Sequence, residues 1–300
     1  MANPPVRSIS LPSREHPCSV RIEALLNHLK SFQFSPSAPY ESEIIQSSLA
    51  GLAELYNCVE EFMNSPSMQQ ALTTAKHAAG KLVEQALEGS ITLLDSCNMA
   101  REILMTMKEH VQTLQSALRR KGRGRDSSIE STIHAYLSFR KKAKKDIAKC
   151  LGGLKRMEIA NNVTNASSPP LDLSQDLLNI VKILGETSDI TISVFWSLLK
   201  FLSLPTSSAT KAKGWSLISK LVRTRLVPFE KEESKIVNLA ANIDISLQTL
   251  LGNVQSNEVK VAQKMLETLN LSSEGLVAGL DCMFRCLVQN RVSLLNILTR

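Results

Sequence analysis

Histidine and cysteine, the residue types most often used for metal binding and nucleophilic catalysis, are few and scattered in this chain of 300 residues. No HExxH, CxxC, GxxxxGK[ST], GxGxxG or GxSxG pattern occurs in it. The sequence therefore predicts no catalytic residue, no metal ligand and no cofactor site, and we interpret the chain as a non-enzyme. The residues concerned are His16, His28, His77, His110 and His134, with Cys18, Cys58, Cys97, Cys150, Cys282 and Cys286.

Positive charge is concentrated in one sector of the chain. Residues 119–145 hold ten basic and two acidic side chains, a net +8, so the other 273 residues carry −1 of the total +7. A solvated helix face is one interpretation of this sector, and contact with a phosphate-bearing surface is the other. The candidate anion or lipid contacts lie in its first part, a turn broken by two glycines, and are Arg119, Arg120, Lys121, Arg123 and Arg125.

Heptad spacing on both sides of that turn predicts two long helices. Apolar residues from 79 to 118 recur at alternating steps of three and four, and the same rhythm resumes from 129 to 154 with one charged intruder, Arg140. We therefore expect an antiparallel helical hairpin over about 79–157. In that register Arg140 lies level with about residue 105, which makes Glu102 and Glu109 candidate ion-pair partners of Arg140, Lys141 or Lys144.

The same 3.6-residue period continues through the rest of the chain, so the predicted fold is all-α, an elongated helical bundle without a sheet. We expect a flexible N-terminal segment (1–17) and one helical domain (18–300). That domain includes helices near 18–32 and 41–63, a polar linker at 160–170, and C-terminal helices over 171–298. Among the C-terminal helices we expect two between 171 and 204, a short one around Trp215, and three more at about 230–254, 256–270 and 273–298. The last of these, predicted over 273–298, carries Asn290 in an otherwise apolar seam, so Asn290 and Arg140 are candidate partner or register contacts.

The first 17 residues contain no apolar leader, and the most apolar stretch, 190–204, is interrupted by Lys200 and too short to span a bilayer. We therefore expect an intracellular, cytoplasmic protein that could also lie on a membrane surface. Plastid targeting, suggested by the absence of acidic residues before Glu15, is not favoured because prolines oppose an amphipathic helix. Ser10 and Ser128 each follow an arginine by three residues and are candidate phosphorylation sites.

Several segments, taken in order, resemble one plant-specific family, the Bypass-like proteins. They are RSISLPSREHP (7–17), LEGSITLLDSCNMAREIL (87–104), LQSALRRKGRGRDSSIES (114–131), KKAKK (141–145), KGWSLISKL (213–221) and FRCLVQNRVSLLNILT (284–299). The resemblance implies a single helical domain, no known catalytic activity, and a role in root and shoot development.

From this we expect a non-enzymatic scaffold, adaptor or regulator in plant development or stress signalling that acts through protein partners. The alternative is a peripheral membrane protein that docks on anionic lipid through the basic turn 119–125. Sequence-specific nucleic-acid binding is not expected, because the turn offers no recognition helix. The sequence leaves the partner and the oligomeric state open.

Overall fold

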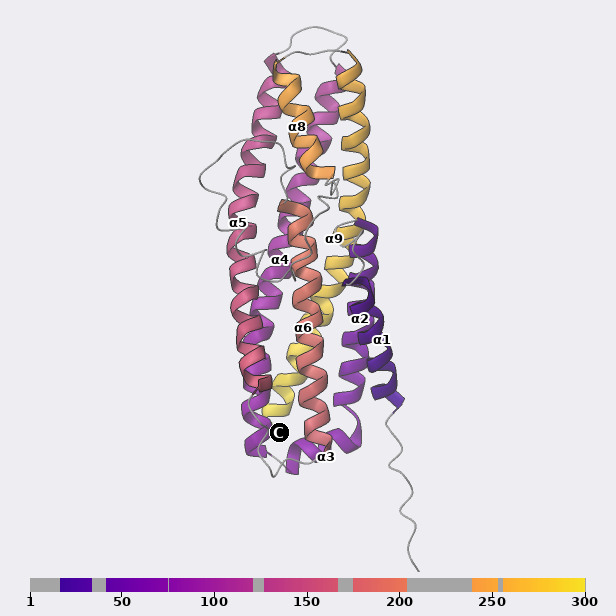
Figure 1. The fold of residues 1–300 in the computed structure, drawn as a ribbon, viewed down its shortest axis with the longest axis vertical. Helices are drawn as coiled ribbons and strands as arrows, with labels where there is room; N and C mark the ends of the chain where they lie inside the picture. Colours follow the sequence, from indigo (N-terminus) through magenta and orange to yellow (C-terminus); the bar gives the residue numbers. More distant parts are fainter. Residues whose placement is uncertain are drawn as a thin grey trace, which may run out of the picture.

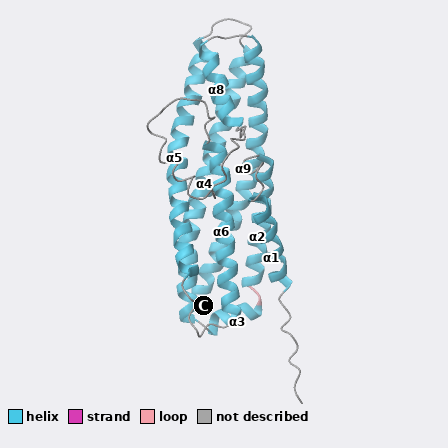
Figure 2. Cartoon of the chain, viewed as in Figure 1, coloured by secondary structure: helices cyan, strands magenta, loops and turns pink. Residues whose placement is uncertain are grey.

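The computed structural model describes residues 17–33, 42–74, 76–120, 127–166, 175–203, 239–252 and 256–299. Throughout these ranges the regular elements are helices, and none of the described residues forms a strand (Figure 2). The predicted all-α class is therefore confirmed for this part of the chain. The helices are α1 (Pro17–Gln33), α2 (Ser42–Met63), α3 (Pro66–Thr74), α4 (Lys76–Arg120), α5 (Ser127–Ala166), α6 (Gln175–Ser203), α8 (Leu239–Gly252) and α9 (Ser256–Thr299).

Three long helices determine the shape of the molecule. α4, α5 and α9 have 45, 40 and 44 residues and run along the long axis in Figure 1. At 1.5 Å per residue each is about 60–68 Å long. α6 packs among them in the lower part of the view, α8 lies beyond its end in the upper part, and α1 and α2 cover the side next to α9 (Figure 1).

The heptad residues of α4 and α5 form much of the core. From Leu93 to Leu118 in α4, and from Ile129 to Leu154 in α5, every a and d position is buried. Contacts between the helices join Gly89 to Met157, and His110 to Phe139, so the numbers of paired residues rise on one helix as they fall on the other. The two helices are therefore antiparallel.

Several helices are longer than the sequence predicts. α5 continues to Ala166, so residues 160–166 of the expected polar linker are helical. Asn161 explains part of this extension, because its Nδ2 donates to Ser188 Oγ and Asp189 Oδ1 of α6 at 2.9 and 3.0 Å. α6 and α9 are each one continuous helix where two were expected, and α3 was not predicted. The short helix expected near Trp215 lies outside the described residues.

Two glycines let α2 pack closely on α9. A Cβ added at Gly279 would lie 3.1 Å from Leu49 Cδ1, and one added at Gly275 would lie 2.2 Å from Gln46 Oε1. Because the glycines are four residues apart, they lie on the same side of α9. This side of α9 therefore has no side chains at these two positions, and Gln46 and Leu49 of α2 occupy the space.

Candidate functional site

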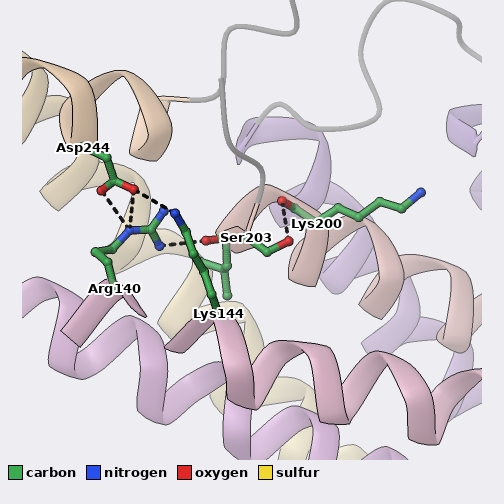
Figure 3. Close-up of polar contacts among 6 residues, drawn as sticks. Arg140, Lys144, Lys200, Ser203 and Asp244 are labelled. Atoms are coloured by element: carbon green, nitrogen blue, oxygen red, sulfur yellow. Dashed lines mark hydrogen bonds and ion pairs between the residues drawn. The ribbon is translucent and has the colours of Figure 1, made fainter. Parts of the chain in front are cut away.

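Arg140, the charged intruder in the heptad seam, is buried and paired with a carboxylate from α8. Its Nε lies 3.0 Å from Asp244 Oδ1, and its Nη1 donates to the Leu202 carbonyl at the end of α6 at 2.7 Å. Lys144, one turn further along α5, lies 3.3 Å from Asp244 Oδ2 (Figure 3). One guanidinium therefore joins α5, α6 and α8.

The charge of Arg140 is kept in spite of its burial. Burial lowers the pKa of the guanidinium, but Tyr136 and the Asp244 carboxylate raise it by more, so that the net shift is upward. Asp244 is thus the partner that the interior position requires. The expected pairing with Glu102 or Glu109 is wrong, because both are exposed on α4 and neither forms an ion pair with Arg140.

A cavity of about 120 Å³, partly open to solvent, lies between six helices. Residues of α2, α3, α4, α5, α6 and α9 line it, and most of their side chains are apolar. None of the described residues that line it carries a formal charge at neutral pH. The described lining of the cavity is therefore largely apolar and uncharged.

Two residues of the lining each have a fully buried polar atom without a hydrogen-bond partner. Asn290 is 7% exposed and its Oδ1 is unpartnered, and Thr187 is 3% exposed with an unpartnered Oγ1. Both residues line the cavity. Asn290, predicted as a partner or register contact, thus lies in the interior, and the structure does not bring it near Arg140's partners Asp244 and Leu202.

Tyr56 lines another part of the cavity, and its hydroxyl is hydrogen-bonded to Thr191 of α6. Thr191 Oγ1 donates to the Thr187 carbonyl at 2.6 Å, so the Tyr56 hydroxyl, 3.2 Å from Thr191 Oγ1, is the donor in that pair. Burial raises the pKa of Tyr56 to about 12. The phenol is therefore neutral at physiological pH.

The outward side of α9 carries a row of exposed apolar side chains, here called the α9 stripe: Phe284, Val288, Val292 and Leu295. Their exposed fractions are 36–43%, and their spacings of four, four and three place them along one side of the helix. Arg285, also exposed, lies among them. Apolar side chains grouped in this way are typical of an interaction surface, whereas isolated ones are not.

The other predicted site residues are only partly within the described chain. Arg119 and Arg120 are exposed at the end of α4, and Ser128 is the second residue of α5. Lys121, Arg123, Arg125 and Ser10 lie outside the described residues.

Two common kinds of site are absent from the part of the chain that the structure describes. No group of three or more histidine, cysteine or acidic side chains there could hold a metal ion. None of the described helices is long and apolar enough to cross a membrane.

Sequence reasoning missed Asp244, Thr187 and the α9 stripe. A signal for Asp244 exists, because it stands next to Ile243 and three residues before Leu247, within the buried side of its helix. The stripe could have been read from the apolar residues left over once the a and d positions of α9 were assigned. Thr187 has no such signal, since its role depends on which helices meet around it.

Comparison with known proteins gave one result. A search of curated proteins and a search of solved structures found no match to the chain. The family model described as Protein BPS1 matches residues 48–297, which is most of the chain and includes the helices from α2 to α9 almost entirely. The chain therefore belongs to the BPS1 family, the plant family of Bypass-like proteins.

Proposed function

We propose that this protein is a non-enzymatic helical scaffold or regulator in plant root and shoot development or stress signalling, and that it acts through protein contacts. Membership of the BPS1 family supports the plant setting. The observation that carries the proposal is the α9 stripe, a row of exposed apolar side chains on a long helix whose opposite side is packed into the bundle.

The chemistry of the stripe defines the partner that fits it. Its four side chains span 12 residues, about 16 Å of helix from the first to the last, which is the length over which an amphipathic helix presents three or four apolar anchors. Arg285 adds a positive charge among them. The partner we propose is an amphipathic helix with a carboxylate beside its apolar side.

The test is replacement of the native gene by a stripe variant, Val288→Lys with Val292→Lys. Charge on the stripe opposes docking of an apolar surface without disturbing the buried side of α9. We expect the variant to accumulate to the wild-type level and to fail to support normal root and shoot growth.

The matched control is Ile159→Lys with Val163→Lys, two exposed apolar residues of α5 with the same spacing of four. We expect the control to support normal growth. Normal growth in both lines would overturn the proposal that the stripe carries the function.

Docking on anionic lipid is a second candidate function, supported by the exposure of Arg119 and Arg120 at the end of α4. Each basic side chain close to such a surface contributes about 1 kcal/mol. The test is flotation with anionic vesicles over a salt series. Binding that is lost with salt, and lost when Arg119, Arg120, Lys121, Arg123 and Arg125 are replaced by glutamine, supports docking, and equal behaviour of both proteins contradicts it.

A further inference from the structure

Two exposed apolar side chains of α4 lie on the side of that helix next to the α9 stripe. Ile91 and Met105 are 47% and 41% exposed. Asn98 stands midway between them, seven residues from each, so the three side chains share one side of α4. They form a second row, which we call the α4 row.

Ion pairs between the two helices place the α4 row beside the stripe. Arg101 of α4 pairs with Asp281 of α9, and Lys108 Nζ lies 2.8 Å from Glu274 Oε1, so α4 and α9 are antiparallel. In this register Ile91 lies level with the middle of the stripe.

The two rows also point to the same side of the bundle. Met105 lies one turn beyond Arg101 on α4, and on α9 Phe284 and Val288 follow Asp281 by three and seven residues. Both rows therefore pass close to the Arg101–Asp281 ion pair and remain partly exposed. Together they are here called the α4–α9 face.

Four carboxylates border this face along α4. Glu88, Asp95, Glu102 and Glu109 are all exposed and follow one another at intervals of seven residues. This spacing places them along one side of the helix, about 10.5 Å apart. Each of the first three precedes a member of the α4 row by three residues, so the acidic row and the α4 row are neighbours.

The negative charge of the acidic row is not neutralised within the described part of the chain. None of the four carboxylates forms an ion pair with another described residue. Arg101 and Lys108, the basic side chains of α4 at this level, pair with α9 instead. Glu102 accepts a hydrogen bond from Asn98 at 2.9 Å, which leaves its charge in place.

We propose that the α4–α9 face binds an amphipathic helix that carries lysine or arginine at seven-residue spacing along the flank next to α4. The inference rests on the proposed function, since the α9 stripe forms part of the face. Apolar anchors of such a helix meet the stripe, and basic side chains seven residues apart repeat at the same distance of about 10.5 Å as the carboxylates.

The opposite flank of the stripe has the opposite charge. Arg285 stands four residues before Gln289, whose amide donates to Glu60 of α2, so it lies on the flank away from α4. The carboxylate inferred for the partner therefore belongs on that flank. Unlike charges on the two flanks fix the orientation of the bound helix and select it among amphipathic helices.

The test measures binding of two model peptides to the full chain by fluorescence anisotropy. Both form five helical turns, about 18 residues, with leucine at helical spacing on one side. One carries lysine at seven-residue spacing on the flank, and the other carries glutamate at the same positions. We expect the lysine peptide to bind more tightly by at least about tenfold at low salt, and the difference to shrink as salt is added.

Variants of the chain assign the preference to the acidic row. Glu88→Lys with Asp95→Lys is expected to reverse it. The matched control, Glu23→Lys with Glu43→Lys, changes two exposed carboxylates on α1 and α2 by the same charge and should keep it. Val288→Ser with Val292→Ser removes apolar anchors without adding charge, so it should weaken both peptides alike.

The outcomes separate this inference from the proposed function. Equal binding of the two peptides, or a lysine preference that survives Glu88→Lys with Asp95→Lys, would overturn the basic partner and leave the stripe as a docking surface. Binding of neither peptide, or binding that Val288→Ser with Val292→Ser leaves unchanged, would overturn helix docking on the stripe as well. A dimer of the chain in sedimentation that the serine variant dissociates would assign the face to a second copy and also overturn the inference.

Discussion

Arg140 Nε and Asp244 Oδ1, 104 positions apart in the chain, lie 3.0 Å apart in the interior of the bundle. The pair joins the first half of α5 to α8, at the level where α6 ends and its Leu202 carbonyl accepts from the same guanidinium (Figure 3). The position of α8 on the bundle is therefore specified by one charge as well as by apolar packing.

Removal of the carboxylate from this pair is expected to destabilise the protein strongly. In Asp244→Asn the guanidinium of Arg140 stays buried without a countercharge, and such a change typically costs about 3–5 kcal/mol. The free energy of unfolding measured in urea should fall by that amount. The double variant Arg140→Met with Asp244→Leu should recover most of the loss, because neither charge is then buried.

The exposed pair Arg21–Glu54, with its nitrogen and oxygen 2.7 Å apart, provides the matched control. Glu54→Gln should change the stability little, because water and salt screen a surface pair. An Asp244→Asn variant as stable as Glu54→Gln would contradict the importance of the buried pair.

A larger side chain is expected to have opposite effects on stability at Gly279 and at Gly80, because only Gly279 is in close contact with another helix. Gly279→Val places a branched side chain where Leu49 already lies within 3.1 Å of the first added carbon, so we expect a loss of about 1–3 kcal/mol. Gly80→Ala, in α4, meets no atom within 4 Å and should stabilise the protein by about 0.5–1 kcal/mol. Thermal unfolding of both variants checks the prediction, and a shift of the same sign in both would refute it.

Two buried acidic groups predict a loss of stability at alkaline pH. Burial raises the pKa of Cys97 from 9.0 to about 12 and the pKa of Tyr56 from 10.0 to about 12. In both groups the protonated form is neutral, so their contribution is fully present below pH 9. It is lost as the pH rises through 9 and 10 toward 12, because the unfolded chain releases these protons first.

We therefore expect the free energy of unfolding to decrease between pH 9 and pH 11, and to decrease less in Cys97→Ala than in the wild type. Urea unfolding at pH 8, 9, 10 and 11 measures this. Identical pH dependence in the two proteins would show that the thiol of Cys97 does not contribute.

The helical class could be predicted from the sequence because heptad spacing is a local signal. The a and d positions of α4 from Leu93 to Leu118 are buried as their spacing requires. The limits of the helices were less predictable, because polar runs such as 160–166 resemble a linker until a neighbouring helix supplies partners. In this case the partners are Ser188 and Asp189 of α6, which accept hydrogen bonds from Asn161.

The candidate sites depended more on tertiary structure. Arg140 stood out in the sequence, but its partner lies on a helix far along the chain, so spacing within the hairpin pointed to Glu102 and Glu109 instead. Asn290 was recognised as unusual, whereas its position in a cavity wall with Thr187 follows from the meeting of α6 and α9. No local pattern encodes that meeting.

The central proposal, that the α9 stripe carries protein contacts, is tested most directly by site-specific photocrosslinking in plant tissue. Benzoylphenylalanine is placed at Val288 in the stripe, or at the exposed control position Ile159 on α5. We predict a protein adduct at Val288 that is absent at Ile159, that disappears with Val292→Lys, and whose crosslinked peptide has apolar residues at helical spacing beside a carboxylate. Adducts of equal yield at both positions, or no protein adduct at Val288, would contradict it.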